Sequence, residues 1–129
     1  MSNNVKQKIL AIGNPMTVCR LSAKIDAEQF AVTGCESSTE AATLLEHEHF
    51  DVVIVDNLVH NADKVCKNAA ITADTPVALL LQDKLVDWRS LGELKVDGFI
   101  LDGGTKAEFM ARIRAYIRRK PADSTSPGN

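Results

Sequence analysis

The sequence has no hydrophobic run long enough to cross a bilayer and no excess of charge of either sign. A transmembrane helix needs about 20 consecutive apolar residues, and residues 1–6 lack the basic and then apolar plan of a signal peptide. Fifteen Lys and Arg residues oppose seventeen Asp and Glu residues, so the formal net charge is only -2. Nucleic-acid-binding domains usually carry a strong basic excess. These absences predict a cytoplasmic protein with no membrane contact and no direct contact with nucleic acid.

Cysteine is also scarce. The three cysteines, Cys19, Cys35 and Cys66, are far apart and form no C-x-x-C pair, which argues against disulfide or metal chemistry. Reduced and mostly buried thiols are predicted, as is usual in a cytoplasmic protein. His47 and His49 do not make a metal site either, because residues two apart do not face each other on a helix.

Enough apolar residues are present for one folded domain. The chain has 129 residues, of which 45% are hydrophobic and 25% charged, as is ordinary for a single soluble domain. We expect a flexible N-terminus over residues 1–6 and one domain over residues 7–120. The polar residues 121–129 are expected to form a flexible tail or the start of a linker.

Apolar runs alternate with helical patterns five times along the chain. The run Val52–Val55 is β-branched throughout and has no polar alternation, which is typical of a strand buried on both faces of a parallel sheet. The last helix has a capping box at Thr105 and Glu108, followed by an apolar stripe of Phe109, Met110, Ile113 and Ile117. A (βα)5 series with short connections predicts an α/β fold, a doubly wound three-layer sandwich with helices on both faces of a parallel sheet.

Ligands of such sheets bind beyond the carboxyl ends of the strands. The residues expected there are Gly13, Asn14, Asp56, Asn57, Leu81, Gln82, Asp102 and Gly103. Asp56 has the clearest chemical meaning, because a carboxylate at a strand end can serve as a nucleophile, a metal ligand or a cap. No phosphate-cradling glycine loop and no P-loop lysine accompanies it.

The segment Phe50–Asp56 resembles the third strand of the response-regulator receiver domain, the CheY-like fold of bacterial two-component signalling. The segment Glu108–Arg119 is similar to the fifth helix of that family. Thr75–Val77 and Asp97–Phe99 fit the starts of its fourth and fifth strands. The resemblance extends over residues 7–120 and implies a five-stranded parallel sheet of order 2-1-3-4-5.

The resemblance implies a phosphoacceptor at Asp56, but three of the four catalytic positions of the family are altered. The acidic pair that holds Mg²⁺ falls on Gly13 and Asn14, the hydroxyl residue on Leu81, and the lysine on Asp102. A carboxylate that attacks a phosphate needs such cations, because the two groups repel each other. We interpret the chain as a degenerate receiver, or pseudo-receiver, which is not an enzyme, needs no cofactor and binds Mg²⁺ weakly or not at all.

A pseudo-receiver is expected to act by binding a protein: a sensor kinase, an output domain or another signalling protein. Related receivers commonly bind partners through the face of helix four, strand five and helix five. An inward apolar stripe leaves Arg112, Tyr116 and Arg119 for the outer surface of the last helix, and Arg and Tyr are enriched at interface hot spots. Trp88 either extends this patch or packs in the core. We expect a monomer or a weak dimer.

Three alternatives stay open. Phe99 takes the position of the aromatic residue that often swings between inward and outward positions in receivers, or it is a core residue. The chain could be a phosphoaccepting receiver with an unusual metal geometry that uses Asp56, Asp102 and backbone carbonyls. It could also be a small flavodoxin-like domain that binds a cofactor at the same edge of the sheet.

Overall fold

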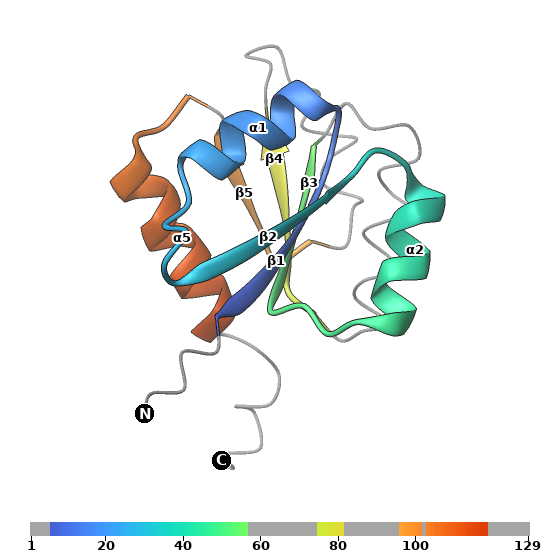
Figure 1. Cartoon of the computed structure of the whole chain (residues 1–129). Helices are drawn as coiled ribbons and strands as arrows, with labels where there is room; N and C mark the ends of the chain where they lie inside the picture. Colours follow the sequence, from blue (N-terminus) through green and yellow to red (C-terminus); the bar gives the residue numbers. More distant parts are fainter. Residues whose placement is uncertain (1–5, 57–74, 82–95, 102, 119–129) are drawn as a thin grey trace.

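The structure is a computed structural model that describes residues 6–56, 75–81, 96–101 and 103–118 (Figure 1). In chain order the elements are β1 (Gln7–Ile12), α1 (Pro15–Ala23), β2 (Phe30–Cys35), α2 (Ser38–His47), β3 (Val52–Asp56), β4 (Val77–Leu81), β5 (Gly98–Leu101) and α5 (Lys106–Arg118). Two of the five predicted helical patterns fall within residues 57–74 and 82–95, which lie outside the described residues. Within the described ranges, no helix is long and apolar enough to cross a membrane.

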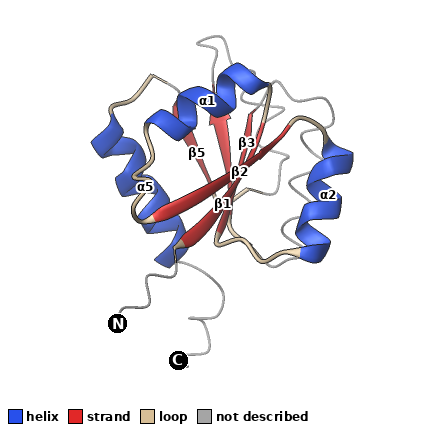
Figure 2. Ribbon diagram, viewed as in Figure 1, coloured by secondary structure: helices blue, strands red, loops and turns tan. Residues whose placement is uncertain are grey.

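The five strands form one parallel sheet of order β2-β1-β3-β4-β5, which confirms the predicted order. The central strands β3 and β4 are buried along their whole length, as the unbroken apolar runs predicted. In Figure 2, α1 and α5 cover one face of the sheet and α2 covers the other. The structure thus has three layers, with β2 and β5 at the edges of the sheet.

Alternate residues of each strand enter two separate cores, one on each face of the sheet. The core under α1 and α5 is built from Ile9, Ala11, Leu21, Val52, Ile54, Ala78, Leu80, Ile100, Phe109, Met110, Ile113 and Tyr116. The core under α2 is built from Leu10, Ile12, Ala41, Leu45, Val53, Val55, Val77, Leu79 and Leu81. Both cores extend to the carboxyl ends of the strands, so they hold that edge of the sheet in place.

Two aspartates fix the amino ends of neighbouring strands. The Asp51 carboxylate accepts a hydrogen bond from the Lys8 backbone N–H (2.8 Å), and the Asp97 carboxylate accepts one from the Val77 N–H (2.7 Å). The N–H of each aspartate donates in return to the carbonyl of the same partner, at 2.8 Å and 2.7 Å. The two aspartates that bound the third strand therefore differ in role: Asp51 sets the register, and Asp56 lies at the candidate site.

Capping side chains begin α2 and α5. Ser37 accepts a hydrogen bond from the Glu40 N–H at the start of α2. At α5 the Thr105 N–H donates to the Glu108 carboxylate (3.0 Å), and the Glu108 N–H donates to the Thr105 hydroxyl (3.1 Å). This backbone hydrogen bond from Thr105 lowers the pKa of Glu108 below its usual value. The reciprocal pair confirms the capping box.

The inward face of α5 differs from the predicted stripe at Tyr116, which is 4% exposed and packs in the core. Tyr116 lies three residues after Ile113, a spacing that places both side chains on one helix face. Its ring lies on Gly98, which has no side chain, and its hydroxyl donates to the Phe99 carbonyl (3.2 Å). The prediction that Tyr116 lies on the outer surface is therefore wrong. Arg112 is exposed as predicted.

The cysteines agree only in part with the predicted burial. Cys35 is buried at the end of β2, whereas Cys19 on α1 is exposed. Cys66 lies outside the described residues. The expectation of mostly buried thiols is therefore wrong for Cys19, which lies on the solvent side of its helix.

Candidate functional site

Asp56 lies at the carboxyl edge of the sheet with its side chain inside the fold. It ends β3, pairs in register with Leu80 of β4, and is only 2% exposed. On its other side, Val55 pairs with Ile12, the last residue of β1. The connection that follows β1 therefore passes directly beside Asp56. This places the predicted phosphoacceptor residue between two strand ends, where a parallel sheet binds ligands.

Gly13 lies next to the Asp56 side chain. A Cβ built at Gly13 would lie 3.1 Å from the Cβ of Asp56 and 3.3 Å from its Oδ2, and 3.4 Å from the Cγ2 of Thr17. The Gly13 N–H donates to the Cys35 carbonyl (3.0 Å), so β2 holds the backbone here. A side chain at position 13 would thus lie against the Asp56 carboxylate. Glycine supplies no side-chain oxygen there.

The Asn14 side chain caps the start of α1. It is the N-cap of α1, and its Oδ1 accepts a hydrogen bond from the Thr17 N–H (2.9 Å). The next residue, Pro15, occupies the first helical position, where its lack of an N–H costs nothing. The amide oxygen that could replace a carboxylate ligand is therefore engaged in starting the helix.

Thr17 is a site residue that the sequence reasoning missed. It is 1% exposed and lies in the first turn of α1, next to the space that Gly13 leaves open. A polar residue three positions after a capping Asn is the only signal in the sequence that pointed to it. Its methyl group is part of the wall around Gly13.

The other residues described at this edge, Leu81 and Phe99, are apolar. Leu81 ends β4, is 3% exposed and belongs to the core under α2. Phe99 is partly buried and packs against the same core. Asn57, Gln82 and Asp102 lie outside the described residues. Of the described residues at this edge, Asp56 is thus the buried carboxylate, and around it lie Gly13, the capping Asn14, the buried Thr17 and Leu81.

Comparison with known proteins adds relatives and fold neighbours. No family model matches the chain. The protein named "Probable transcriptional regulator ycf27" of Porphyridium aerugineum is 29% identical over 128 residues, which cover 96% of this chain and 52% of that protein. "Regulatory protein VirG" of Rhizobium radiobacter is 33% identical over 96 residues, covering 71% of this chain and 36% of that protein. The chain thus spans about half the length, or less, of these curated relatives.

Solved receiver domains share the fold. A CheY-like response regulator receiver domain protein from Methanospirillum hungatei matches with a TM-score of 0.75 and 12% identity, over 93% of this chain and 100% of that chain. The receiver domain of a sensor histidine kinase from Pseudomonas aeruginosa, with a magnesium ion coordinated in its active site cleft, matches with a TM-score of 0.74 and 16% identity, over 88% and 99%. The chain is a receiver-like domain of the response-regulator type.

The receiver-like domain keeps arginines on the outer side of its last helix. Arg112, Arg114 and Arg118 of α5 are exposed. One Arg114 guanidinium nitrogen donates to the Gln29 side-chain oxygen (2.8 Å) and so connects α5 to the start of β2. The other predicted interface residues, Trp88 and Arg119, lie outside the described residues.

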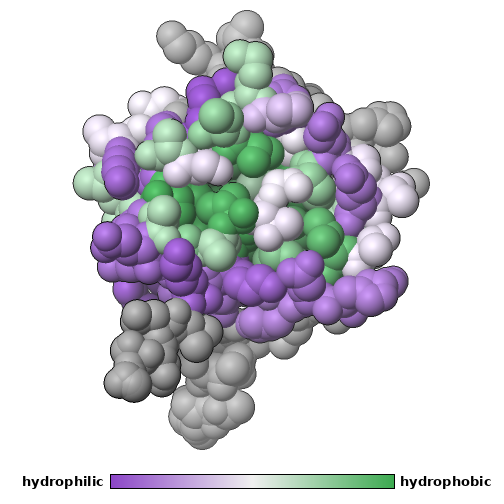
Figure 3. Space-filling view, in the orientation of Figure 1, coloured by the Kyte–Doolittle hydropathy of each residue, from purple (hydrophilic) through white to green (hydrophobic). Residues whose placement is uncertain are grey.

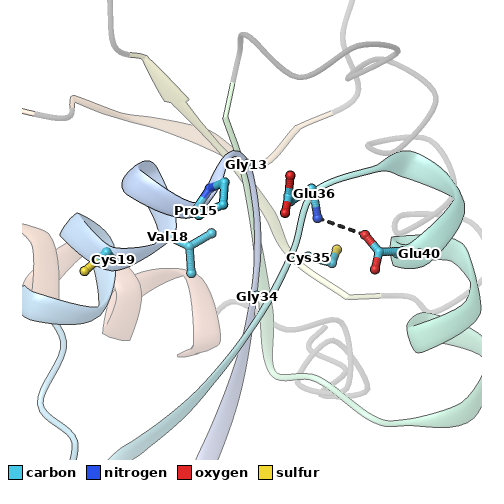
Figure 4. A pocket seen from close by; sticks show the side chains of 8 residues that line it. All are labelled: Gly13, Pro15, Val18, Cys19, Gly34, Cys35, Glu36 and Glu40. Atoms are coloured by element: carbon cyan, nitrogen blue, oxygen red, sulfur yellow. Dashed lines mark hydrogen bonds between the residues drawn. The ribbon is translucent and has the colours of Figure 1, made fainter.

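The receiver-like domain also has a groove that the sequence did not indicate, at the carboxyl end of β2 between α1 and α2 (Figure 4). Its volume is about 350 Å³, and its lining residues are Gly13, Pro15, Val18, Cys19, Gly34, Cys35, Glu36 and Glu40. Burial, and next the Glu40 carboxylate, raise the pKa of the Cys35 thiol to about 11. That thiol therefore stays protonated at neutral pH, and the groove combines an apolar floor with two carboxylates at one end.

Proposed function

We propose that this chain is a pseudo-receiver that binds a protein partner without phosphorylation of Asp56. The observation that supports this proposal is that Gly13 lies against the Asp56 carboxylate, at a position where the resemblance to receivers implies an acidic residue. By the resemblance, receivers have a metal-binding acidic pair at the positions that Gly13 and Asn14 occupy in this chain. Without it, the charge repulsion between a carboxylate and an incoming phosphate is not compensated.

The side chains that the structure describes at Gly13, Asn14 and Leu81 do not fit Mg²⁺. This ion prefers oxygen ligands with octahedral geometry and is usually bound through one or two carboxylates. Gly13 offers no side-chain oxygen, and the Asn14 Oδ1 already accepts the Thr17 N–H at 2.9 Å. Leu81 is apolar and buried in the core under α2. We therefore derive no metal-dependent step for this chain.

Addition of Mg²⁺ should leave the melting temperature of the wild-type chain unchanged relative to NaCl of equal ionic strength. The variant Gly13→Asp with Asn14→Asp should gain a Mg²⁺-dependent rise of about 2–4 °C or more. Thermal unfolding, followed by circular dichroism and by the fluorescence of Trp88, measures both. Asn14→Asp alone is the second variant. It adds one carboxylate and keeps the cap of α1, since Asp is also a good N-cap. A Mg²⁺-specific rise in the wild type would contradict the proposed loss of the metal site.

We further propose that the partner binds the outer side of α5. In support, α5 buries Phe109, Met110 and Ile113 and so keeps a fixed position on the sheet. Arg112 is exposed on it, and arginine is a residue that interface hot spots favour. Since Tyr116 is buried, a change at Tyr116 would disturb folding and cannot report on binding.

The charge-reversing substitution Arg112→Glu should reduce partner recovery by the immobilised chain at least tenfold, because a lost hot spot costs about 2 kcal/mol or more. Arg20→Glu on α1, which is also exposed, is the matched control and should recover as much partner as the wild type. Quantitative mass spectrometry of the captured proteins measures recovery. Equal losses for both variants would place the binding surface elsewhere.

A further inference from the structure

β2 is an edge strand of the sheet, and its outer side directs backbone groups away from the sheet. The Gln7 N–H donates to the Gln29 carbonyl (3.1 Å), and the Gly13 N–H donates to the Cys35 carbonyl (3.0 Å). In a parallel pair, alternate residues direct their N–H and C=O groups toward the same neighbouring strand. The odd-numbered residues of β2 therefore bond to β1, and the even-numbered residues face away from it.

Two of these outward residues have no backbone partner in the described part of the chain. The Phe30 N–H donates to the Asp26 carbonyl (3.0 Å), and the Glu36 N–H donates to the Glu40 carboxylate (3.1 Å). Between them, Val32 and Gly34 present two N–H groups and two carbonyls. Natural edge strands are usually protected by lysine, proline or a bulge, and residues 30–35 contain neither lysine nor proline. Apolar side chains gather in the middle of this face, surrounded by hydrophilic ones (Figure 3).

The groove lies next to one of these residues, Gly34. A Cβ built there would lie 2.6 Å from Val18 Cγ1, so glycine allows α1 to pack closely onto β2. Figure 4 shows the Val18 side chain directed toward Gly34, with Pro15 and Cys19 also on the α1 side of the groove. Gly34 itself is exposed and adds no side chain. A side chain from a strand laid along β2 would enter the groove at this point.

We propose that β2 pairs in antiparallel orientation with β2 of a second copy of this chain, about a twofold axis at Thr33. Val32 of each copy then lies opposite Gly34 of the other. Each such pair exchanges two N–H to carbonyl hydrogen bonds, so four bonds pair the outward groups of Val32 and Gly34 in both copies. The edge is self-complementary, as a twofold interface requires.

The side chains fit the same arrangement. Directly opposite residues of an antiparallel pair project from the same face of the sheet. Val32 packs against the core under α1 and α5, and the Val18 side of the groove lies on that face. Val32 of the second copy therefore enters the groove above Gly34, and the symmetry repeats this contact. At the axis the two Thr33 side chains are neighbours, a favourable cross-strand pair.

Charge selects this register over the next one. An axis at Val32 would place Glu36 opposite Glu28 of the second copy, and like charges directly opposite are destabilising. With the axis at Thr33, Ser37 lies opposite Gln29 of the second copy, whose side chain holds Arg114. That guanidinium then approaches Glu36 and Glu40 at the end of the groove. The small net charge of -2 opposes association only weakly.

Analytical ultracentrifugation of the full chain tests the proposal. The wild type should show a concentration-dependent monomer–dimer equilibrium. Val32→Pro removes an N–H that faces away from β1, whereas the control Val32→Ala keeps it. The dimer dissociation constant of Val32→Pro should therefore be at least tenfold higher than that of Val32→Ala. Arg114→Glu should also weaken the dimer, and Arg114→Glu with Glu36→Arg should restore it. A wild type that stays monomeric at all concentrations, or equal constants for the two Val32 variants, would overturn the proposal.

A disulfide test remains decisive if Val32→Pro fails to fold. Residues opposite each other in a non-hydrogen-bonded pair have Cα atoms about 4.5 Å apart, which is within disulfide range. In a Cys19→Ser background, Thr33→Cys should form a covalent dimer under mild oxidation at least tenfold faster than Thr43→Cys, which is exposed on α2. Equal rates for the two variants would refute pairing at Thr33. Neither test involves Asp56, so its outcome is independent of the proposed loss of phosphorylation.

Discussion

Replacement of Gly98 by alanine is expected to lower the free energy of unfolding by about 2–3 kcal/mol, at the upper end of the usual cost of overpacking. A Cβ at Gly98 would overlap the Tyr116 hydroxyl and lie 2.6 Å from Cε1 and 2.7 Å from Cζ of the ring. Tyr116 cannot simply move away, because it is buried and its hydroxyl donates to the Phe99 carbonyl. Urea unfolding of the two proteins measures the difference.

A double-mutant cycle separates this contact from a general effect of glycine loss. In a Tyr116→Leu background the obstructing ring and hydroxyl are absent, so Gly98→Ala should cost at least about 1 kcal/mol less than in the wild type. If the cost is the same in both backgrounds, Tyr116 is not the reason that glycine occupies position 98. The packing of α5 on β5 would then need a different explanation.

The second large effect is expected for Ile113→Ala, which should destabilise the chain by about 2–5 kcal/mol. Ile113 is 0% exposed and lies in the core between α5 and the sheet. Removing its side chain leaves a cavity there that its neighbours fill only in part. Arg112→Ala is the control on the adjacent, exposed position and should change stability by less than about 0.5 kcal/mol. A loss below about 1 kcal/mol for Ile113→Ala would mean that α5 contributes little to the fold.

The central part of the fold follows from local sequence patterns. The run Val52–Val55 has no polar position, and a strand with this pattern is stable only when covered on both faces, where the structure has it. Thr105 and Glu108 could be identified as a cap because their hydrogen bonds join neighbours in the sequence. Features that depend on short-range chemistry were therefore predictable.

Tyr116 shows what local patterns leave open. Both Tyr116 and Ile117 fit the helical spacing from Ile113, and the more hydrophobic residue was expected to face inward. In the structure Tyr116 is buried because Gly98, 18 positions earlier in the chain, leaves room for its ring. In addition, the Phe99 carbonyl of β5 accepts a hydrogen bond from its hydroxyl. Neither contact can be read from the helix itself.

The candidate site likewise has features that the sequence predicts and features that depend on how the elements pack. That Gly13 and Asn14 occupy the positions of the acidic pair is a prediction from the receiver resemblance of the sequence. The close approach of Gly13 to Asp56 and the burial of Thr17 depend on how β1, β3 and α1 pack together. The groove beside Gly34 likewise depends on how α1, β2 and α2 pack together.

These features describe a receiver-like fold with two packed cores and a buried Asp56 at the carboxyl edge of its sheet. Gly13 lies against Asp56 and Asn14 caps α1, and in the proposed pseudo-receiver neither residue binds a metal. A domain of this kind can still present fixed surfaces on α5 and β2. Its role in signalling would then be set by what binds those surfaces, rather than by a covalent change at Asp56.

The most direct measurement is intact-mass spectrometry after incubation of the chain with acetyl phosphate and Mg²⁺. The proposed loss of phosphorylation predicts an unchanged mass for the wild type, identical to that of the Asp56→Asn variant. An active receiver domain treated in the same way serves as the positive control for the reagent. A stoichiometric gain of one phosphoryl group by the wild type, absent from Asp56→Asn, would contradict the pseudo-receiver interpretation.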